Sequence, residues 1–442
     1  MRLFRLLCWK ILLLISRQNK LFNETVCIRT VSPSKKILDE KIDKIVNFAR
    51  NHVGNYKTKT THEIKEEIIT RKLLKETSDG ALADEYKRNL DIYQIRLDDS
   101  PIKNLFRIIF GRDFTFTMTT GGTSGSPLSI SKNKNSIIED AFLFIRGWKF
   151  MGYKVGDKVL VLYNSYYDYD LIWINKISCL FGIKLFFFDQ LDKETVTKFI
   201  NVNNKYKPDF IVTFPSYIND VARTIQENKI KIDHYPKGIE VSGETLFKHQ
   251  RLNAEREFKT KIYDNYGSIE IGVIAHECKY HNGMHIYEDI VKVTSNKSNL
   301  IFTRYDSFDM PIINYQIGDL GKVEFNKCKC GIEGLKLTSV DGRVDDYVLI
   351  ENKRFYPTLF RQIINKSNTK FNNEIIESQI EQKSANEIKI NIVCRTHRYI
   401  NEIKKYIKIE IGKKLPKSAQ ISVVNMVKLK NVRKFRFIER NN

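Results

Sequence analysis

Between residues 137 and 213, the apolar positions follow two alternating patterns. Short segments that are mostly apolar predict buried strands at 158–163, 183–188 and 209–213. Apolar residues at helical spacing predict helices at 137–152, 171–180 and 194–204. Because a helix separates each of these strands from the next, the segment predicts right-handed crossovers and a largely parallel sheet, and therefore an α/β core.

The flanking segments carry different patterns. Residues 38–77 alternate apolar and charged side chains at helical spacing and predict helices, and short strands are predicted at 93–95 and 115–118. After residue 346 the pattern predicts strands and a helix that would form a small α+β C-terminal domain, with its boundary near residues 342–346. These elements are strands at 347–350 and 389–394 and a helix at 399–412.

A glycine-rich stretch follows the strand at 115–118. Residues 119–127 read TTGGTSGSP and hold three of the chain's 21 glycines within five positions. Glycine lets backbone N–H groups close on a ligand, and threonine and serine add short donors, so the stretch is typical of a loop around phosphate oxygens. It is not a Walker loop, because no Gly-Lys-Ser/Thr follows the glycines. The alternative is a flexible, hydroxyl-rich turn between two strands.

Two further motifs follow predicted strands. Residues 242–244 (SGE) come after a predicted strand at 238–241 (GIEV), and Tyr266 and Gly267 come after a predicted strand at 261–263 (KIY). Ligands of parallel sheets bind at the carboxyl ends of the strands. Both motifs therefore lie where a nucleotide is expected.

Composition limits the classes of protein that fit. With 442 residues the chain is too long for one ordinary core, so two or three domains are expected. The 74 Lys and Arg residues against 52 Asp and Glu residues give a net charge of +22, which favours anionic partners such as nucleotides or CoA. The positive charge is spread along the chain, and no zinc-finger, RNP or helix-turn-helix pattern stands out, so we expect no nucleic-acid partner.

The N-terminus is apolar and basic. A short apolar run at 11–15 is flanked by Arg2, Arg5, Lys10 and Arg17. Lys10 interrupts the segment that a signal peptide would need, and the run is shorter than the roughly 20 apolar residues of a membrane span. The pattern instead predicts an amphipathic helix, packed on the main domain or in at most weak contact with an anionic membrane surface, with packing preferred. A cytoplasmic location is the expectation that follows.

The seven cysteines are odd in number and do not predict a disulfide framework. Cys278 begins the sequence CKYH, which ends at His281, and His285 follows; Cys328 and Cys330 lie in the sequence CKC. Thiolate and imidazole ligands suit a structural Zn²⁺ site with four protein ligands. The fourth ligand would be His281 or His285, and the Cys-x-x-His spacing favours His281. The competing interpretation is three reduced cysteines near a loop.

Five motifs occur in an order that resembles the adenylate-forming (AMP-binding) superfamily. They are the glycine-rich stretch at 119–127, YGSIE at 266–270, YQIGD at 315–319, GRVDD at 342–346 and Lys434 in RKFR. The pieces TFPSY at 213–217, SGE at 242–244 and KFRF at 434–437 look most like the phenylacetate–CoA ligase branch and the CapK-like capsular polysaccharide proteins. The resemblance covers the chain after about residue 85.

The resemblance implies a large α/β N-terminal domain with parallel sheets and helices, and a small, mobile α+β C-terminal domain. The implied divisions are an N-terminal helical segment packed on the main domain (1–84), an ATP-binding and acyl-substrate core (85–342) and a C-terminal lid (343–442) with a hinge at Asp345. The C-terminal domain would swing about this hinge between adenylation and the transfer step.

The resemblance also implies roles for single residues. The cradle for the ATP phosphates would consist of Thr120, Gly121, Gly122, Thr123, Ser124 and Gly125. The other nucleotide contacts would come from Gly243, Glu244, Tyr266, Gly267, Ser268, Asp319 and Arg343, with Asp319 on the ribose hydroxyls. Glu270 would hold Mg²⁺, and Lys434 would bridge the ATP phosphate and the substrate carboxylate. The acid pocket is predicted near 163–169, 214–217 and Ser242, and the resemblance favours His285 as the fourth zinc ligand.

The implied reaction is that of an AMP-forming ligase, which activates a carboxylic acid with ATP and Mg²⁺ to acyl-AMP. CoA is the expected acceptor of the acyl group. The CapK-like alternative is transfer to an amine or hydroxyl of a surface polysaccharide precursor. An alternative from another class is a basic binding protein that retains the fold without turnover.

Overall fold

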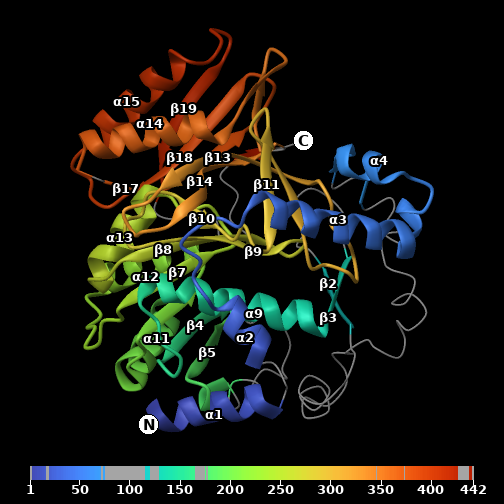
Figure 1. The fold of residues 1–442 in the computed structure, drawn as a ribbon. Helices are drawn as coiled ribbons and strands as arrows, with labels where there is room; N and C mark the ends of the chain where they lie inside the picture. Colours follow the sequence, from blue (N-terminus) through green and yellow to red (C-terminus); the bar gives the residue numbers. More distant parts are fainter. Residues whose placement is uncertain are drawn as a thin grey trace.

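A large mixed sheet and a smaller C-terminal sheet organise the chain (Figure 1). The structure, a computed structural model, describes residues 2–15, 19–70, 73–74, 115–119, 129–164, 175, 178–344, 346–372, 374–426 and 438–440.

One half of the large sheet is parallel, with the order β5–β4–β6–β7–β8. Its strands are β4 (Val159–Asn164), β5 (Ile183–Phe188), β6 (Phe210–Thr213), β7 (Gly238–Ser242) and β8 (Ile262–Ser268). One face packs on three helices, and the other packs on α9 (Lys134–Trp148). The three helices are α11 (Lys193–Tyr206), α12 (Pro215–Asn228) and α13 (Lys248–Phe258). The predicted parallel α/β core is confirmed in this half.

Local signals explain where two of these helices begin. The carboxylate of Asp192 accepts a hydrogen bond from the N–H of Thr195 (2.8 Å) at the start of α11. Pro215 occupies the first turn of α12, where its missing N–H costs no hydrogen bond. Both helices therefore start within a few residues of the strands that precede them.

The other half of the large sheet is antiparallel and continues in the order β8–β9–β10–β14–β13–β12–β11. Its strands are β9 (Gly272–Glu277), β10 (Met284–Ile286), β11 (Val291–Asn296), β12 (Asn299–Arg304), β13 (Tyr315–Lys327) and β14 (Glu333–Arg343). Helices α3 (Lys35–His52) and α4 (Thr61–Glu66) pack against it over a core that includes Ile45 and Ile64.

The prediction of helices over 38–77 is wrong at residues 69 and 70. There Ile69–Thr70 forms strand β1, which pairs in parallel with β13. The reason is local: Ile69 is buried, and its N–H donates to the carbonyl of Asn314 (3.1 Å).

Helix α1 (Arg2–Ile15) lies at the end of the molecule away from the C-terminal sheet (Figure 1). In this helix, Arg5 Nε donates to the carbonyl of Gly156 (2.7 Å), and Trp9 Nε1 donates to the carbonyl of Phe181 (3.0 Å). Helix α2 (Asn19–Thr25) follows and packs against α9. Within the described ranges, no helix has the length and apolar character needed to cross a membrane.

The C-terminal part is a small α+β unit, as predicted. A four-stranded sheet of order β19–β18–β17–β20 packs against two helices, with a two-stranded sheet beside them. The elements are β15 (Val348–Ile350), β16 (Lys353–Phe355), α14 (Pro357–Lys370), β17 (Ile375–Gln382), β18 (Glu387–Cys394), α15 (Ile400–Gly412), β19 (Gln420–Asn425) and β20 (Ile438–Arg440). An ion pair between Arg223 of α12 and Glu377 (3.1 Å) joins this unit to the main body.

Some predicted elements fall outside the described residues. These are the strand at 93–95 and most of the helix at 171–180. The predicted strand at 115–118 is present as β2 (Thr115–Thr119), which pairs with β3 (Ser129–Asn133) in an antiparallel hairpin.

Candidate functional site

Two turns at the carboxyl ends of β7 and β8 depend on glycine. At Gly243 the backbone φ is +80°, and a Cβ would lie 2.5 Å from Cε1 of Phe214. At Gly267 a Cβ would lie 2.6 Å from the carbonyl oxygen of Gly272. A side chain at either position would displace its neighbours, so glycine permits these close approaches. Both residues lie at the edge of the sheet where a parallel topology places its ligand.

Tyr266, Asp319 and Arg343 form one hydrogen-bonded group at this edge. Tyr266 Oη donates to Asp319 Oδ2 (2.8 Å), and Arg343 Nε donates to Asp319 Oδ1 (3.1 Å). The pairing of β13 with β14 sets Asp319 directly opposite Arg343. Burial, followed by the Asp319 carboxylate, raises the pKa of Tyr266, so the phenol keeps the proton that it donates. The structure thus brings together three residues predicted for nucleotide contact.

Glu270 lies in the turn between β8 and β9 and is only 3% exposed. Its Oε1 accepts a hydrogen bond from Tyr315 Oη (3.3 Å), and the turn is held by a hydrogen bond from the N–H of Ile271 to Ser268 Oγ (3.1 Å). A carboxylate held in this way offers the hard oxygen ligand that Mg²⁺ prefers.

A buried ion cluster supports this turn, and the sequence interpretation missed it. Arg304 Nη1 donates to the carbonyl of Ile271 (2.6 Å) and to the carboxylate of Asp140. Lys132 Nζ donates to the other oxygen of Asp140 (2.6 Å). Since Lys132 belongs to β3 and Asp140 to α9, the cluster ties the β2–β3 hairpin to the turn that carries Glu270. No spacing rule in the sequence marks these three charged side chains as neighbours.

Aromatic rings surround the position of Gly243. The ring of Phe214 packs against Tyr163 (centroids 5.4 Å apart) and Tyr217 (5.0 Å), and Tyr217 packs against Phe188 (5.0 Å). They come from the carboxyl ends of β4, β5 and β6 and from the start of α12. Tyr163, Phe214 and Tyr217 belong to the predicted acid pocket, and Phe188 adds a ring that the sequence interpretation did not include.

Glu244 has a partner of its own. Its Oε2 accepts a hydrogen bond from the N–H of Ser216 (3.1 Å) in the first turn of α12. A carboxylate at a helix N-terminus satisfies a free N–H group and is favoured by the helix dipole. The carboxylate of Glu244 therefore orders the loop beside Gly243, and the predicted contact of Glu244 with the nucleotide stays a prediction.

Several predicted site residues lie outside the described residues. They are the phosphate-loop residues 120–125, acid-pocket residues 165–169, the hinge Asp345 and Lys434. Their roles remain predictions. Thr119 at the end of β2 pairs with Ser129 at the start of β3, so the loop connects two paired strands.

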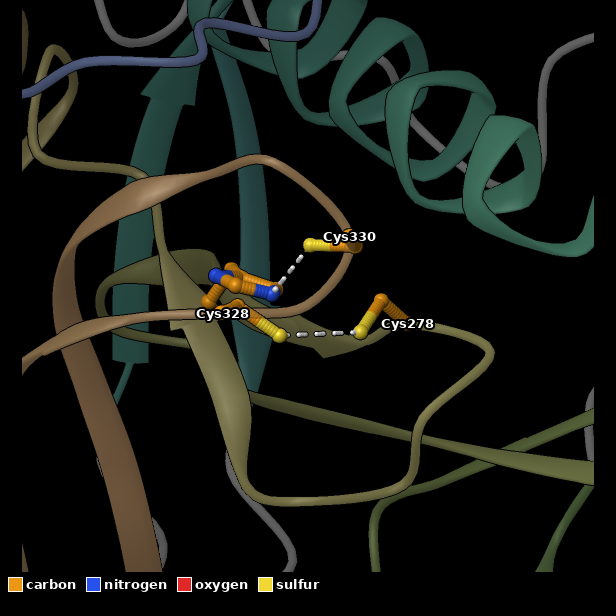
Figure 2. A group of neighbouring side chains, drawn as sticks. Cys278, Cys328 and Cys330 are labelled. Carbon is orange, nitrogen blue, oxygen red and sulfur yellow. Dashed lines mark hydrogen bonds between the residues drawn. The ribbon is translucent and has the colours of Figure 1, made fainter.

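Cys278, His285, Cys328 and Cys330 form a separate group. One potential ligand atom from each lies within 4.8 Å of the others. Cys278 Sγ is 3.7 Å from Cys328 Sγ, and Cys330 Sγ is 3.3 Å from His285 Nε2. Figure 2 shows the three cysteines converging, with Cys328 and Cys330 on one loop and Cys278 facing them. A hydrogen bond from the N–H of Gly331 to the carbonyl of Cys328 (3.0 Å) shapes that loop.

This group fits a tetrahedral metal ion. Zn–S bonds of about 2.3 Å give sulfur–sulfur edges of about 3.8 Å in a tetrahedron, close to the observed Cys278–Cys328 distance. Burial, followed by the nearby Lys336, lowers the pKa of His285 to about 4. The imidazole is therefore neutral near pH 7 and can offer a nitrogen lone pair to a metal. Three sulfur donors and one nitrogen donor are typical of Zn²⁺.

His281, favoured by its spacing, lies outside this group. Its Nδ1 is 3.0 Å from Glu277 Oε2 and 3.1 Å from Arg251 Nη1. The structure thus brings His285 to the three cysteines, while His281 contacts an ion pair on the adjacent strand and helix.

Comparisons with known proteins agree with the resemblance seen in the sequence. No protein-family model matches the chain. The chain is 26% identical over 240 residues to Protein CapK of Staphylococcus aureus, a match that covers 50% of this chain and 49% of CapK. It is 22% identical over 269 residues to a phenylacetate-coenzyme A ligase of Thermus thermophilus, covering 55% of this chain and 58% of the ligase. The chain thus spans about half the length of the curated relatives that it matches.

Solved structures share the fold. A 2-hydroxyisobutyryl-CoA ligase in the postadenylation state, in complex with R3-HIB-AMP, matches with a TM-score of 0.69 and 15% identity over 92% of this chain and 89% of the ligase. An open conformation of the same ligase, in complex with 2-HIB-AMP and CoA, matches with a TM-score of 0.57 and 14% identity over 91% and 90% of the two chains. The relatives and the fold together confirm the resemblance to the adenylate-forming superfamily.

Proposed function

We propose that this chain is an AMP-forming ligase that activates a carboxylic acid with ATP and then passes the acyl group to CoA. The observation that carries the proposal is the arrangement of Tyr266, Asp319 and Arg343 beside Glu270 at the strand ends. The names of the curated relatives and the acyl-AMP bound by the neighbouring structure support the same reaction class.

The described residues have separate tasks in this reaction. Asp319, oriented by the Tyr266 phenol and the Arg343 guanidinium, accepts hydrogen bonds from the ribose hydroxyls. Glu270 would hold Mg²⁺, and the ion would supply positive charge that offsets the charge of the triphosphate. The acid enters beside the aromatic rings around Phe214, a surface that suits an apolar or aryl acid.

Adenylation and transfer then follow in two balanced steps. A carboxylate oxygen of the acid attacks the α-phosphorus of ATP, the bond to the β-phosphate oxygen breaks, and diphosphate leaves. The CoA thiol then loses its proton to water and attacks the acyl carbonyl, the bond from that carbon to the phosphate oxygen breaks, and AMP leaves with the bonding electron pair. By resemblance, residues 120–125 cradle the phosphates and Lys434 stabilises the charge that develops at phosphorus.

We also propose a structural zinc ion held by Cys278, His285, Cys328 and Cys330. The support is the distance of their ligand atoms from one another and their donor chemistry. Four protein ligands leave no open position for water, so the metal would join the β9–β10 hairpin to the β13–β14 loop rather than take part in catalysis.

A second candidate is acyl or aminoacyl transfer to a polysaccharide precursor. Its support is the match to Protein CapK. Both candidates share the adenylation half and differ only in the acceptor.

Product analysis tests the proposal. The protein is incubated with ATP, Mg²⁺, CoA and a panel of aryl, aliphatic and amino acids, and AMP, ADP and acyl-CoA are measured by mass spectrometry. We expect AMP and acyl-CoA in equal amounts with at least one acid, and a large loss in Glu270→Gln. The matched control is Glu324→Gln, an exposed carboxylate on β13, which should act as the parent does. Acid-dependent AMP without acyl-CoA favours the second candidate, and ADP as the product contradicts both.

A further inference from the structure

Lys336 is a fully buried lysine beside the Cys/His group. It lies on β14 with 0% of its surface exposed, and its Nζ donates to Cys328 Sγ at 3.7 Å. The pairing of β10 with β14 sets Lys336 directly opposite His285. Lys336 therefore lies next to two of the candidate metal ligands, one across the sheet and one in the adjoining loop.

The burial of this ammonium group requires a negative partner. Taking a charge out of water without compensation is strongly unfavourable. Glu324 is opposite Lys336 on β13, but its side chain is exposed to solvent. Among the described residues, the Lys336 ammonium group donates a hydrogen bond to Cys328 Sγ alone. A neutral thiol would leave the ammonium charge uncompensated, whereas a thiolate would balance it.

The metal site supplies the missing charge. Three thiolates and a neutral imidazole around a divalent ion carry a net charge of −1. We propose that Lys336 balances this charge and orients the Cys328 thiolate through an N–H···S hydrogen bond, which makes it a positioning residue of the site. This inference rests on the proposed zinc ion and is independent of the proposed ligase reaction.

Two substitutions and one matched control test the inference in the full chain. Lys336→Met removes the charge at similar length, and Lys336→Arg keeps it. The control is Lys329→Met, which removes the same formal charge from an exposed residue between Cys328 and Cys330. The zinc content, the zinc dissociation constant by chelator competition, and the thiolate-to-metal absorption band after Co²⁺ loading are measured for each.

We expect metal affinity to fall only in the variant that loses the buried positive charge. Loss of a partner outside the ligand shell typically weakens metal binding about 10–100-fold, and we expect Lys336→Met to fall in that range. Lys336→Arg and Lys329→Met should stay close to the parent, and the Co²⁺ band should change only in Lys336→Met. Parent-like affinity in Lys336→Met, equal losses in the Met and Arg variants, or a parent that binds neither Zn²⁺ nor Co²⁺ would overturn the inference.

A double-mutant cycle keeps the test decisive if Lys336→Met fails to fold alone. In a Cys330→His background the loaded site holds two thiolates and is neutral, so the buried cation has less charge to balance. Lys336→Met should then weaken zinc binding less than it does in the parent, or should fold only in this background. The same loss in both backgrounds, or failure to fold in both, contradicts charge balance. None of these outcomes depends on adenylation, which is measured separately.

Discussion

The substitution Asp140→Asn should destabilise the main body while hardly changing its shape. Asp140 lies between Lys132, at 2.6 Å, and Arg304, and these two cations are only 5% and 1% exposed. The asparagine amide keeps the size of the side chain and one acceptor oxygen. It removes the negative charge between two buried positive charges.

The magnitude follows from the burial of the partners. Removing one partner of a buried ion pair costs about 3–5 kcal/mol. Asp140 belongs at the lower end of this range, because its own side chain is 16% exposed and Arg304 keeps a second carboxylate, that of Asp306, at 2.6 Å. We therefore expect a loss of about 3 kcal/mol. An unfolding entropy of about 2.1 cal/mol/K per residue gives a chain of 442 residues a shift of about 1 °C per kcal/mol, so the thermal midpoint should fall by about 3 °C.

The assay is urea and thermal unfolding against a matched control. Glu194→Gln makes the same chemical change in an exposed pair on α11, where Glu194 and Lys198 are 75% and 66% exposed at 2.7 Å. An exposed ion pair of this kind contributes little to stability, so Glu194→Gln should unfold as the parent does. Equal losses in the two variants, or no loss in Asp140→Asn, would refute the reasoning. Because Arg304 also holds the carbonyl of Ile271, Asp140→Asn should raise the KM for ATP as well.

Three further predictions address single positions. Gly243→Ala should raise the KM for the acid more than the KM for ATP, because the added Cβ would lie 2.5 Å from the Phe214 ring. A φ of +80° also costs a residue with a side chain about 1–2 kcal/mol. Equal changes in the two KM values would contradict this. Burial lowers the pKa of His249 to about 3, so stability should fall by about 1.4 kcal/mol per pH unit as the pH drops from about 6.5 towards 3. His249→Gln should flatten this part of the curve of urea midpoint against pH. An unchanged slope would show that His249 is not the group responsible for the loss of stability. Tyr266→Phe removes the donor to Asp319 and should weaken ATP binding about tenfold by calorimetry, as expected for a hydrogen bond to a charged group; parent-like affinity would show that the phenol does not orient the carboxylate.

The parallel half of the sheet could be predicted because its signals are local. Strands β4, β5 and β6 are short, mostly apolar segments of four to six residues, a composition typical of strands in a parallel sheet that helices cover. The resemblance likewise predicted that Tyr266, Asp319 and Arg343 all contact the nucleotide, and these three residues lie together in the structure. β13 and β14 then supply the pairing that joins two of them.

Contacts that depend on tertiary structure could not be predicted. Ile69 becomes a strand residue only because the edge of β13 offers the carbonyl of Asn314. Chain spacing favoured His281 as a metal ligand, but Arg251, from a helix that precedes it, and Glu277 hold its ring away from the cysteines. The burial of Lys336 likewise follows from how two hairpins pack, which no periodicity records.

ATP–diphosphate exchange tests the central claim most directly, because it reports adenylation without needing the acceptor. The protein is incubated with ATP, labelled diphosphate, Mg²⁺ and each acid of the panel, and label in ATP is counted. The account predicts exchange that depends on one class of acid and is lost in Glu270→Ala. No exchange with any acid, together with no measurable binding of ATP, would contradict it.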